Sequence, residues 1–337
     1  MLWVLLALVT AAGTAVRDAA SKHATRWADP IVVGCGISAI PAAALGALVV
    51  VRAAATHGAG FPAALAPGPG FVTALLVSGG INAVTTPLIV WALKRSDLSL
   101  MAPLTSVTPL FMIPVAAVVL GEAPSVAGGV GVAVIVVGAY LLNVSDRSAG
   151  PLAPLRALAR DPGARAMLLV AFLYAISGTY DKVGTQASSP LFWAAAVQAV
   201  IALVLAPLAL RRWGRGRRRG HARPRDPPPA SSPGAASAAA PIPDPEPGSD
   251  PDGGLFAGRI RTPGAAILLA GAVTAIAAAA QMTAITLTLV AYVIAVKRTS
   301  TLFSVLLGHS LFREEGIAER LLGAAVMLAG FVLVTLG

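Results

Sequence analysis

Ten long apolar runs dominate the sequence and leave few folds open to it. Each run has about 20 residues, which as an α-helix spans the ~30 Å hydrocarbon core of a bilayer. Only 12% of the 337 residues are charged, about half the share in a soluble domain. We therefore predict an all-α integral membrane protein with ten transmembrane helices. The predicted spans are residues 2–20, 31–51, 71–93, 98–120, 125–143, 166–184, 190–210, 264–285, 287–311 and 320–336.

The first span is interpreted as a helix that stays in the protein. Met1 leads directly into apolar residues, whereas a secretory signal peptide begins with a basic region. The single cysteine, Cys35, lies inside an apolar run, so neither a disulfide framework nor a cysteine-based metal site is expected. The four histidines are scattered along the chain, and we expect no metal and no cofactor.

One segment, residues 211–262, differs in composition from the rest of the chain. It begins with a run of arginines around Trp213 and continues as a Pro/Ala/Ser tract that ends in acidic residues. Such a composition cannot bury a core, which predicts a disordered loop. The arginines are interpreted as a topology anchor at a helix end. Binding to anionic lipid or nucleic acid is the alternative, but only Trp213 could stack on a base, so no nucleic-acid partner is expected.

The two halves of the chain are related to one another. Gly121-Glu122 and Leu110-Phe111 recur 192 residues later as Arg313-Glu314 and Leu302-Phe303, and Gly13-Thr14 recurs as Gly178-Thr179. We therefore predict a five-helix repeat over 1–143, a connection over 144–165, and a second repeat over 166–337 that contains the 211–262 loop. Five is odd, so the second copy enters the membrane in the opposite sense. Inverted repeats are typical of transporters with a binding site at the midplane.

The order and spacing of several short motifs resemble the EamA-like branch of the drug/metabolite transporter superfamily. The resemblance covers nearly the whole chain apart from the 211–262 loop and implies a ten-helix bundle that moves small metabolites by alternating access. It does not imply a particular substrate. The residues that carry it are Ser99 to Leu104, Thr108-Pro109-Leu110-Phe111, Gly121-Glu122, Gly138 to Leu142, Tyr180 to Gly184, Tyr292 to Ser300, Phe312 to Glu315, and Gly323 with Gly330.

The connections between predicted helices differ sharply in their basic residues. Counted from the N-terminus, the odd connections hold 20 Lys and Arg residues if Arg320 at the start of the last span is included, and the even connections hold only Arg52. Basic connections remain in the cytoplasm. We therefore predict a multi-pass plasma-membrane protein with cytoplasmic odd connections and with both termini outside. This orientation departs from the better-known relatives, whose termini are expected in the cytoplasm.

Two adjacent cations, Lys297 and Arg298, lie deep in the ninth predicted helix. A charge at the bilayer centre costs ~2.5–3.5 kcal/mol on insertion scales, so such residues are candidate site residues. On a helix Lys297, Ser300, Thr301 and Ser304 share one polar stripe. Two cations beside hydroxyl groups suit a carboxylate or a phosphate. The alternative is a structural ion pair of Lys297 with Asp181 or Asp18.

Other polar residues within predicted helices are weaker candidates for the same substrate site. The sixth helix places Tyr174, Ser177, Asp181 and Thr185 on one face, next to Lys182. Interhelical hydrogen bonding is the alternative role for each of the uncharged residues. The remaining candidates are Asn82 in the third helix, Thr105 and Thr108 beside the prolines of the fourth, and Gln281 in the eighth.

Two features near helix ends have structural interpretations. Glu122 and Glu314 fall at helix turns, and each is expected to cap the following helix, where the helix dipole favours a carboxylate; proton coupling is the alternative. Glycines at 131 and 138, and at 323 and 330, put small residues on one face of the fifth and tenth helices. They indicate close packing within the monomer, with a homodimer surface as the alternative.

Together these patterns favour a secondary transporter that exports or exchanges a small, anionic or zwitterionic metabolite. No phosphate-binding G-x-x-x-x-G-K-[ST] loop is present in the sequence, so we expect no ATP-driven pumping and no enzyme activity. The expected partners are a small-molecule substrate and the lipid bilayer. The alternatives are a flippase for a lipid-linked substrate on the same fold, or a membrane scaffold or sensor that transports nothing.

Overall fold

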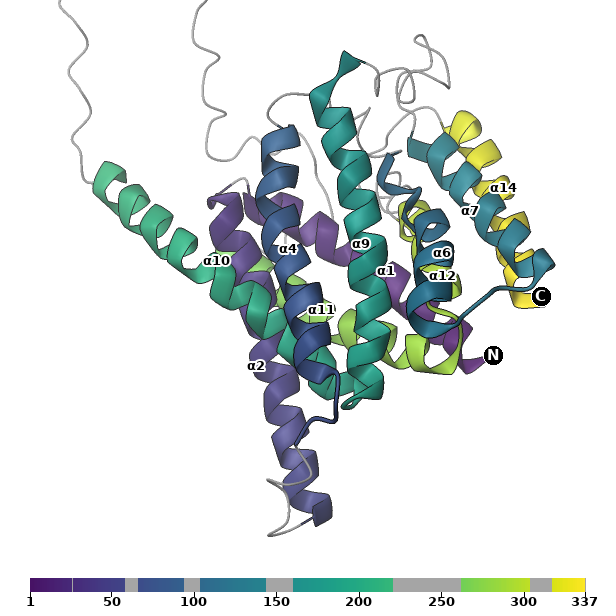
Figure 1. The fold of residues 1–337 in the computed structure, drawn as a ribbon. Coiled ribbons are helices and arrows are strands. Elements are labelled where there is room, and N and C mark those ends of the chain that lie inside the picture. Colours follow the sequence, from purple (N-terminus) through teal and green to yellow (C-terminus); the bar gives the residue numbers. More distant parts are fainter. Residues whose placement is uncertain are drawn as a thin grey trace, which may run out of the picture.

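The computed structural model describes residues 1–25, 27–57, 66–93, 104–143, 160–220, 262–303 and 317–336. Every regular element in these residues is an α-helix, which confirms the predicted all-α class (Figure 1). The described helices are α1 (Leu2–Thr25), α2 (Pro30–His57), α4 (Phe71–Leu93), α6 (Thr108–Leu120), α7 (Val126–Asn143), α9 (Pro162–Gln186), α10 (Pro190–Gly220), α11 (Pro263–Leu287), α12 (Val290–Lys297) and α14 (Ile317–Leu336).

Within the described residues, five helices are long and apolar enough to cross a membrane. They contain Leu2–Thr25, Pro30–Thr56, Pro162–Gln186, Pro190–Trp213 and Gly264–Leu287. Shorter apolar stretches lie in α4, α6, α7 and α14. Large apolar side chains such as Leu76 and Leu203 lie on the outside of the bundle, 70% and 72% exposed. An apolar exterior of this kind is what a helical bundle in lipid requires.

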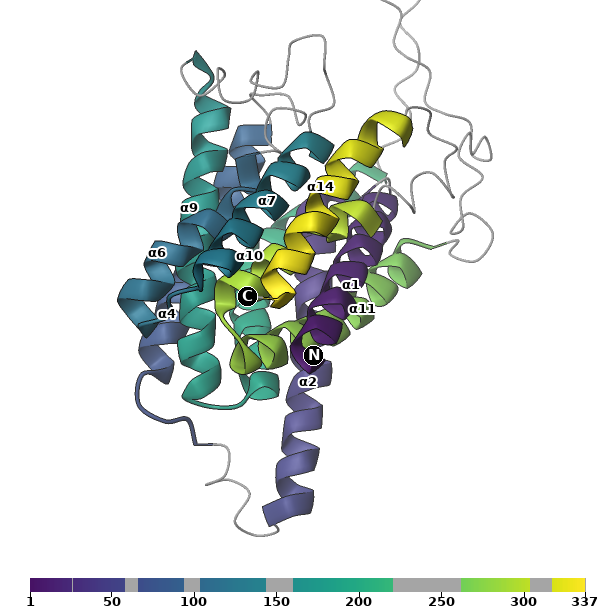
Figure 2. The same ribbon diagram turned by 90° about the vertical axis from the view of Figure 1, so that its right-hand side faces the viewer.

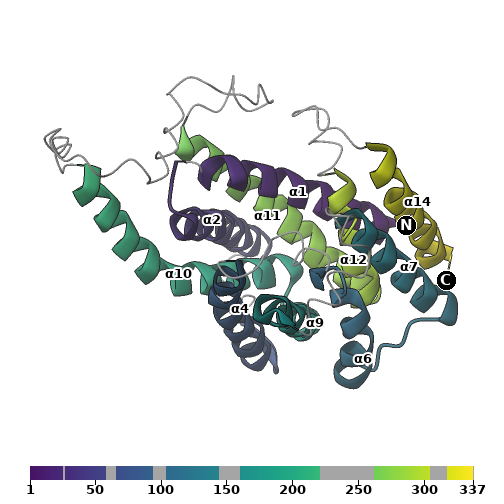
Figure 3. The same cartoon turned by 90° about the horizontal axis from the view of Figure 1, so that it is seen from above.

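The helices of the two predicted repeats interlace instead of forming two separate bundles. Helix α1 runs along α11, and its repeat-related counterpart α9 runs along α4. Helix α2 packs along α10, and α7 packs along α14 (Figures 2 and 3). Each of these pairs joins one helix from residues 1–143 to one from residues 162–337. The interface between the repeats therefore runs through the centre of the molecule.

Glycines bring α7 and α14 into backbone contact. A Cβ atom added at Gly131 would lie 2.7 Å from the Val334 nitrogen, and one at Gly138 would lie 2.6 Å from the Met327 nitrogen. Added Cβ atoms at Gly323 and Gly330 would meet α7 just as closely. Only glycine allows two helix backbones to approach this far. The structure thus uses these residues for packing within the monomer, as the sequence favoured.

Two of the predicted membrane spans are interrupted by a turn. The fourth, predicted over 98–120, has a turn at Ser106–Val107 before α6 begins, and the ninth, predicted over 287–311, turns at Arg298–Thr299 after α12 ends. The backbone at both points forms i to i−3 hydrogen bonds, such as Thr299 N to Val296 O at 2.9 Å. The 192-residue offset relates one turn to the other. The prolines beside Thr105 and Thr108 marked the first turn in the sequence, whereas the polar stripe predicted in the ninth span assumed a continuous helix there.

Local chemistry explains both turns. Pro109 stands in the first turn of α6 and lacks the N–H group that would continue a helix through Val107. The second turn has no proline. Instead, the Thr299 and Thr301 hydroxyls donate to the carbonyls of Val296 and Arg298, at 2.7 and 3.0 Å. Such side-chain bonds compete with the helical ladder and bend it.

The sequence predicted that a loop begins at residue 211, but the arginine run continues a helix. Helix α10 extends beyond the predicted end at residue 210 to Gly220 (Figure 1). Arg212 forms an ion pair with Asp29 at 3.0 Å across the α1–α2 connection. Arginine is a strong helix former, and this composition supports the helix beyond the apolar part of the span. The rest of the predicted loop, 221–261, lies outside the described residues.

Candidate functional site

The two helix breaks lie next to one another, and the pair of cations stands at their junction. Arg298 is the first residue after α12, and its Nη2 donates to the Thr108 hydroxyl at the start of α6, at 2.9 Å. Residues 108 and 298 thus join the repeats at repeat-related turns. The structure brings together four of the predicted site residues here: Lys297, Arg298, Thr108 and Gln281.

Lys297 has a neutral partner. Its ammonium donates to the Gln281 Oε1 of α11 at 2.7 Å. Arg17, Asp18, Asp181 and Arg298 are near enough to act on it electrostatically. Asp18, however, pairs with Arg17 at 2.7 Å, and Asp181 accepts from uncharged donors. Within the described residues Lys297 therefore forms neither of the structural ion pairs considered as its alternative role.

Arg298 is left with unused hydrogen-bonding capacity. Its Nε is buried and has no acceptor among the described residues. Tyr174 of α9 is near enough to interact with the guanidinium electrostatically, and among the described residues Thr108 supplies the one acceptor for its N–H groups. A buried donor without a partner costs about 1–3 kcal/mol, and more for a charged group. The site therefore holds a cation whose surroundings are incomplete.

The remaining hydroxyl candidates near the junction bind the backbone. Thr108 donates to the Thr105 carbonyl at 2.7 Å while it accepts from Arg298. Thr301 donates to the Arg298 carbonyl. Ser300 is partly exposed, and Ser304 lies outside the described residues. Because the helix turns at Arg298–Thr299, the regular polar stripe that was predicted from helical spacing is not continuous.

Asp181 stands in a second polar cluster, where α9 meets α4 and α10. Its Oδ1 accepts from the Ser78 hydroxyl at 2.8 Å and from the Trp193 indole at 3.1 Å. Ser177 lies 3.0 Å from Ser78, and Asn82 donates to Ser177 at 3.3 Å. Sequence reasoning selected Asp181, Ser177 and Asn82 but missed Ser78 and Trp193. The glycine at position 184 is the one sequence feature related to this contact, because a Cβ atom there would collide with the Trp193 ring.

Lys182 faces a different part of the molecule from Asp181. It forms an ion pair with Glu122 and donates to the Thr288 carbonyl at 2.7 Å. The second oxygen of Glu122 accepts from the Val290 amide at 3.2 Å, which caps the start of α12. Glu122 was expected to cap the following helix, α7. That role belongs to Ser125, which accepts from Gly128, so the prediction for Glu122 named the wrong helix. Glu314 lies outside the described residues.

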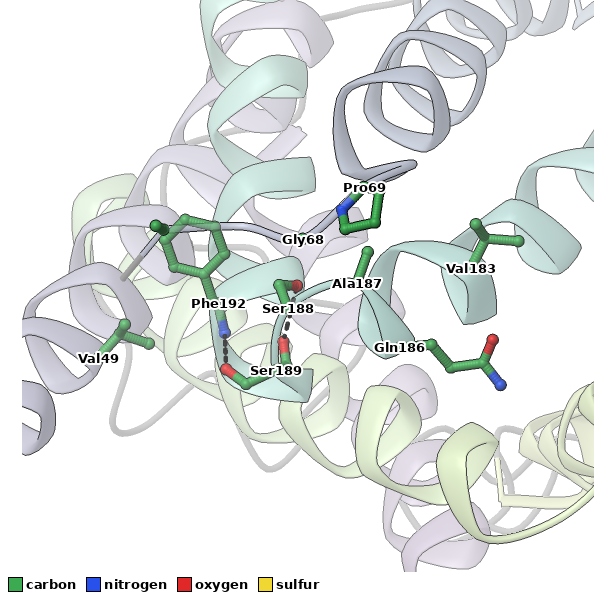
Figure 4. Close-up of a pocket in the computed structure, with 10 residues that line it drawn as sticks. Val49, Gly68, Pro69, Val183, Gln186, Ala187, Ser188, Ser189 and Phe192 are labelled. Atoms are coloured by element: carbon green, nitrogen blue, oxygen red, sulfur yellow. Dashed lines mark hydrogen bonds between the residues drawn. The ribbon is translucent and has the colours of Figure 1, made fainter. Parts of the chain in front are cut away.

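A cavity of about 420 Å³ opens beside the C-terminal end of α9 and the start of α10 (Figure 4). It lies between α2, residues 66–69 and the α9–α10 connection, and its polar side chains are Gln186, Ser188 and Ser189. It contains none of the predicted site residues. Among the described residues, no group of three His, Cys, Asp or Glu side chains could hold a metal ion.

Comparison with known proteins finds one family that is similar to the first part of the chain. The model of the EamA-like transporter family matches residues 1–144, which is the first predicted repeat. A solved structure titled "Crystal structure of protein" is similar over 99% of this chain and 97% of its own, with a TM-score of 0.63 and 14% sequence identity. At that identity the likeness shows the fold alone, and it extends over both halves of the chain.

The described helices and the family match concern the membrane. Five described helices are long and apolar enough to cross it, and residues 1–144 are similar to a family of membrane transporters. No curated protein matches the sequence. The substrate class, the residues that bind it and the orientation in the membrane stay predictions.

Proposed function

We propose that this EamA-like protein is a secondary transporter of a small anionic or zwitterionic metabolite, bound between the repeats at Lys297 and Arg298. The observation that carries this proposal is the unpartnered, buried Nε of Arg298 next to a lysine that has only a neutral acceptor. Two adjacent cations without a carboxylate partner in the described residues are costly inside a membrane protein. A substrate anion would compensate them.

The start of α6 adds to this electrostatic environment. Its N-cap, Val107, has no side chain that could cap the helix, and Thr108 holds Arg298 beside the first turn. Free amide groups at a helix N-terminus carry partial positive charge and favour an anion. Broken helices whose ends meet at the centre of an inverted repeat are a recurrent arrangement for substrate sites in transporters. The repeat-related turns at Ser106–Val107 and Arg298–Thr299 fit this pattern.

Alternating access would then act at the interface between the repeats. At one end of the bundle, Glu122 from the α6–α7 connection holds Lys182 of α9 and the start of α12. These contacts join residues of the first repeat to the second on one side of the candidate site. Their release would open that side, and closure of the other side would complete the cycle.

The test is uptake into proteoliposomes from a panel of labelled organic acids, phosphorylated metabolites, amino acids and cationic amines. Wild-type protein should move at least one anionic or zwitterionic class, and the double variant Lys297→Met/Arg298→Met should not. Arg52→Met is the matched control, because it removes an exposed cation at the end of α2. Uptake of cationic amines alone would contradict the proposal. Movement of labelled lipids instead would favour a flippase.

A further inference from the structure

The Asp181 cluster holds a carboxylate in surroundings unlike those of Asp18, Asp29 and Glu122. Each of those three pairs with a cation. Asp181 is 8% exposed and has no ion pair within the described residues, although it lies on a membrane-spanning helix. Ionisable residues in such positions mark ion pathways and proton relays in membrane proteins. The hydrogen bonds around it show which atom could take a proton.

All the donors that Asp181 receives converge on one oxygen. Both Ser78 and Trp193 donate to Oδ1, whereas Oδ2 accepts no hydrogen bond from the described residues. Ser78 uses its only hydroxyl proton on Asp181, so Ser177 must be the donor in the contact between the two serines. Asn82 donates in turn to Ser177. The cluster is therefore a one-way chain of donors that ends at Oδ1 and leaves Oδ2 free.

Packing fixes this geometry. Trp193 is fully buried, lies directly on Gly184 of α9, and meets the Phe71 ring edge-on at 5.4 Å. Its indole N–H therefore cannot turn away from Asp181 without disturbing three helices. The Ser78 and Ser177 hydroxyls and Asp181 Oδ1 are occupied by hydrogen bonds. Oδ2 is then the one oxygen of this cluster that could receive a cation, and a metal ion needs several oxygen ligands. A proton is the small cation that the arrangement can accept without rearrangement.

The charges that face Asp181 are few. Helices α4, α6 and α11 pack on α9 and contain no charged residue. The charged residues of α10 begin at Arg211, about 20 residues beyond Trp193. On α9 itself, Lys182 is held by Glu122. This leaves Lys297 of α12, which is near enough to act on Asp181 through space without touching it.

We propose that Asp181 is a proton-binding site that takes a proton from water on Oδ2, becomes a neutral acid, and returns the proton to water later in the cycle. The coupling role of this site rests on the proposed anion site at Lys297. While Asp181 is ionised, its charge partly offsets that of Lys297. Once Asp181 is neutral, Lys297 and Arg298 attract an anion more strongly, and the bound anion favours the protonated acid by the same factor. The arrangement gives symport of one proton with one anion.

The site can be tested without a substrate. Protein reconstituted in lipid is examined by pH-difference infrared spectroscopy, in which a protonated carboxylic acid has its own C=O stretching band. Wild-type protein should gain such a band as the pH falls from mildly alkaline to mildly acidic. Asp181→Asn should lack it, and the control Asp29→Asn, which removes an ion-paired carboxylate, should keep it.

A second variant keeps the proposal falsifiable if Asp181→Asn does not fold. Ser78→Ala removes one donor to Oδ1 and leaves the carboxylate, so the band should appear at a higher pH than in wild type. The proposal is overturned if the band is absent, if it persists in Asp181→Asn, or if Ser78→Ala leaves its pH dependence unchanged. An Asp181 that instead binds the ammonium of a zwitterion would stay ionised and give no band. Because no substrate is present, these results are independent of whether Lys297 binds an anion.

Discussion

Among the described residues, two buried groups of charges are completed in opposite ways. Lys182 and Glu122 satisfy one another and also bind a carbonyl and an amide at the α11–α12 connection. Within the same residues, Lys297 and Arg298 have a glutamine, a threonine and an unused N–H. The first group is satisfied by its own neighbours, whereas the second is not. This difference is the basis of our proposals that the first stabilises the fold and that the second binds a substrate.

The largest expected effect is on stability, at the completed group. Lys182→Met leaves the Glu122 carboxylate buried without its cation, and breaking a buried pair in this way costs about 3–5 kcal/mol. The yield of folded protein and its melting temperature in detergent should both fall. The double variant Glu122→Gln/Lys182→Met should recover much of the loss. If Lys182→Met melts as wild type does, the two groups do not differ in the way described.

A smaller effect is expected at the incomplete group when the cation is kept but its shape changes. Arg298→Lys retains the charge but loses the planar guanidinium, whose Nη2 donates to Thr108 and whose Nε is buried without an acceptor among the described residues. We expect the KM for the transported anion to rise about five- to tenfold, which corresponds to about 1–1.4 kcal/mol. The melting temperature should stay near that of wild type. An unchanged KM would show that the fork makes no contact with substrate.

The smallest effect is expected at the neutral partner of Arg298. Thr108→Val keeps the shape of the side chain and removes the hydroxyl that accepts from Nη2. The change removes one acceptor and leaves the guanidinium and its charge in place, so uptake should fall about two- to fourfold, which corresponds to about 0.4–0.8 kcal/mol. Thr335→Val is a matched control, because its hydroxyl bonds only its own helix near the C-terminus. If uptake falls equally in the two variants, the hydrogen bond between Thr108 and Arg298 has no special role in transport.

Much of this account could be predicted from the sequence, because lipid imposes simple rules on it. Ten apolar runs predicted the helices to within a few residues in most cases, and glycine spacing predicted the contact between α7 and α14. Repetition predicted that the halves are related. Lys297, Arg298 and Asp181 were selected because they are charged residues inside predicted membrane spans, without any knowledge of their partners. These features depend on local composition, which a sequence displays directly.

The partners of those residues could not be predicted, because they come from distant segments. Glu122 was assigned to the helix that follows it, although the amide it meets is 168 residues away at Val290. Lys182 was grouped with Asp181 because the two are adjacent, yet successive residues on a helix point about 100° apart. The turn at Arg298–Thr299 was missed because nothing as plain as a proline marks it. Interlaced repeats make long-range contacts of this kind the rule in this fold.

The contrast between the two groups can be tested most directly by parallel measurements on Lys297→Met. This change keeps the volume, removes the charge, and leaves the Gln281 side chain without the ammonium that it accepts from. Uptake of the anion into proteoliposomes and the melting temperature are measured on the same preparation, normalised to folded protein. A charge-assisted contact with substrate contributes about 1.5–3 kcal/mol, so uptake should fall tenfold or more while the melting temperature is unchanged or higher. Wild-type uptake by Lys297→Met would contradict the account.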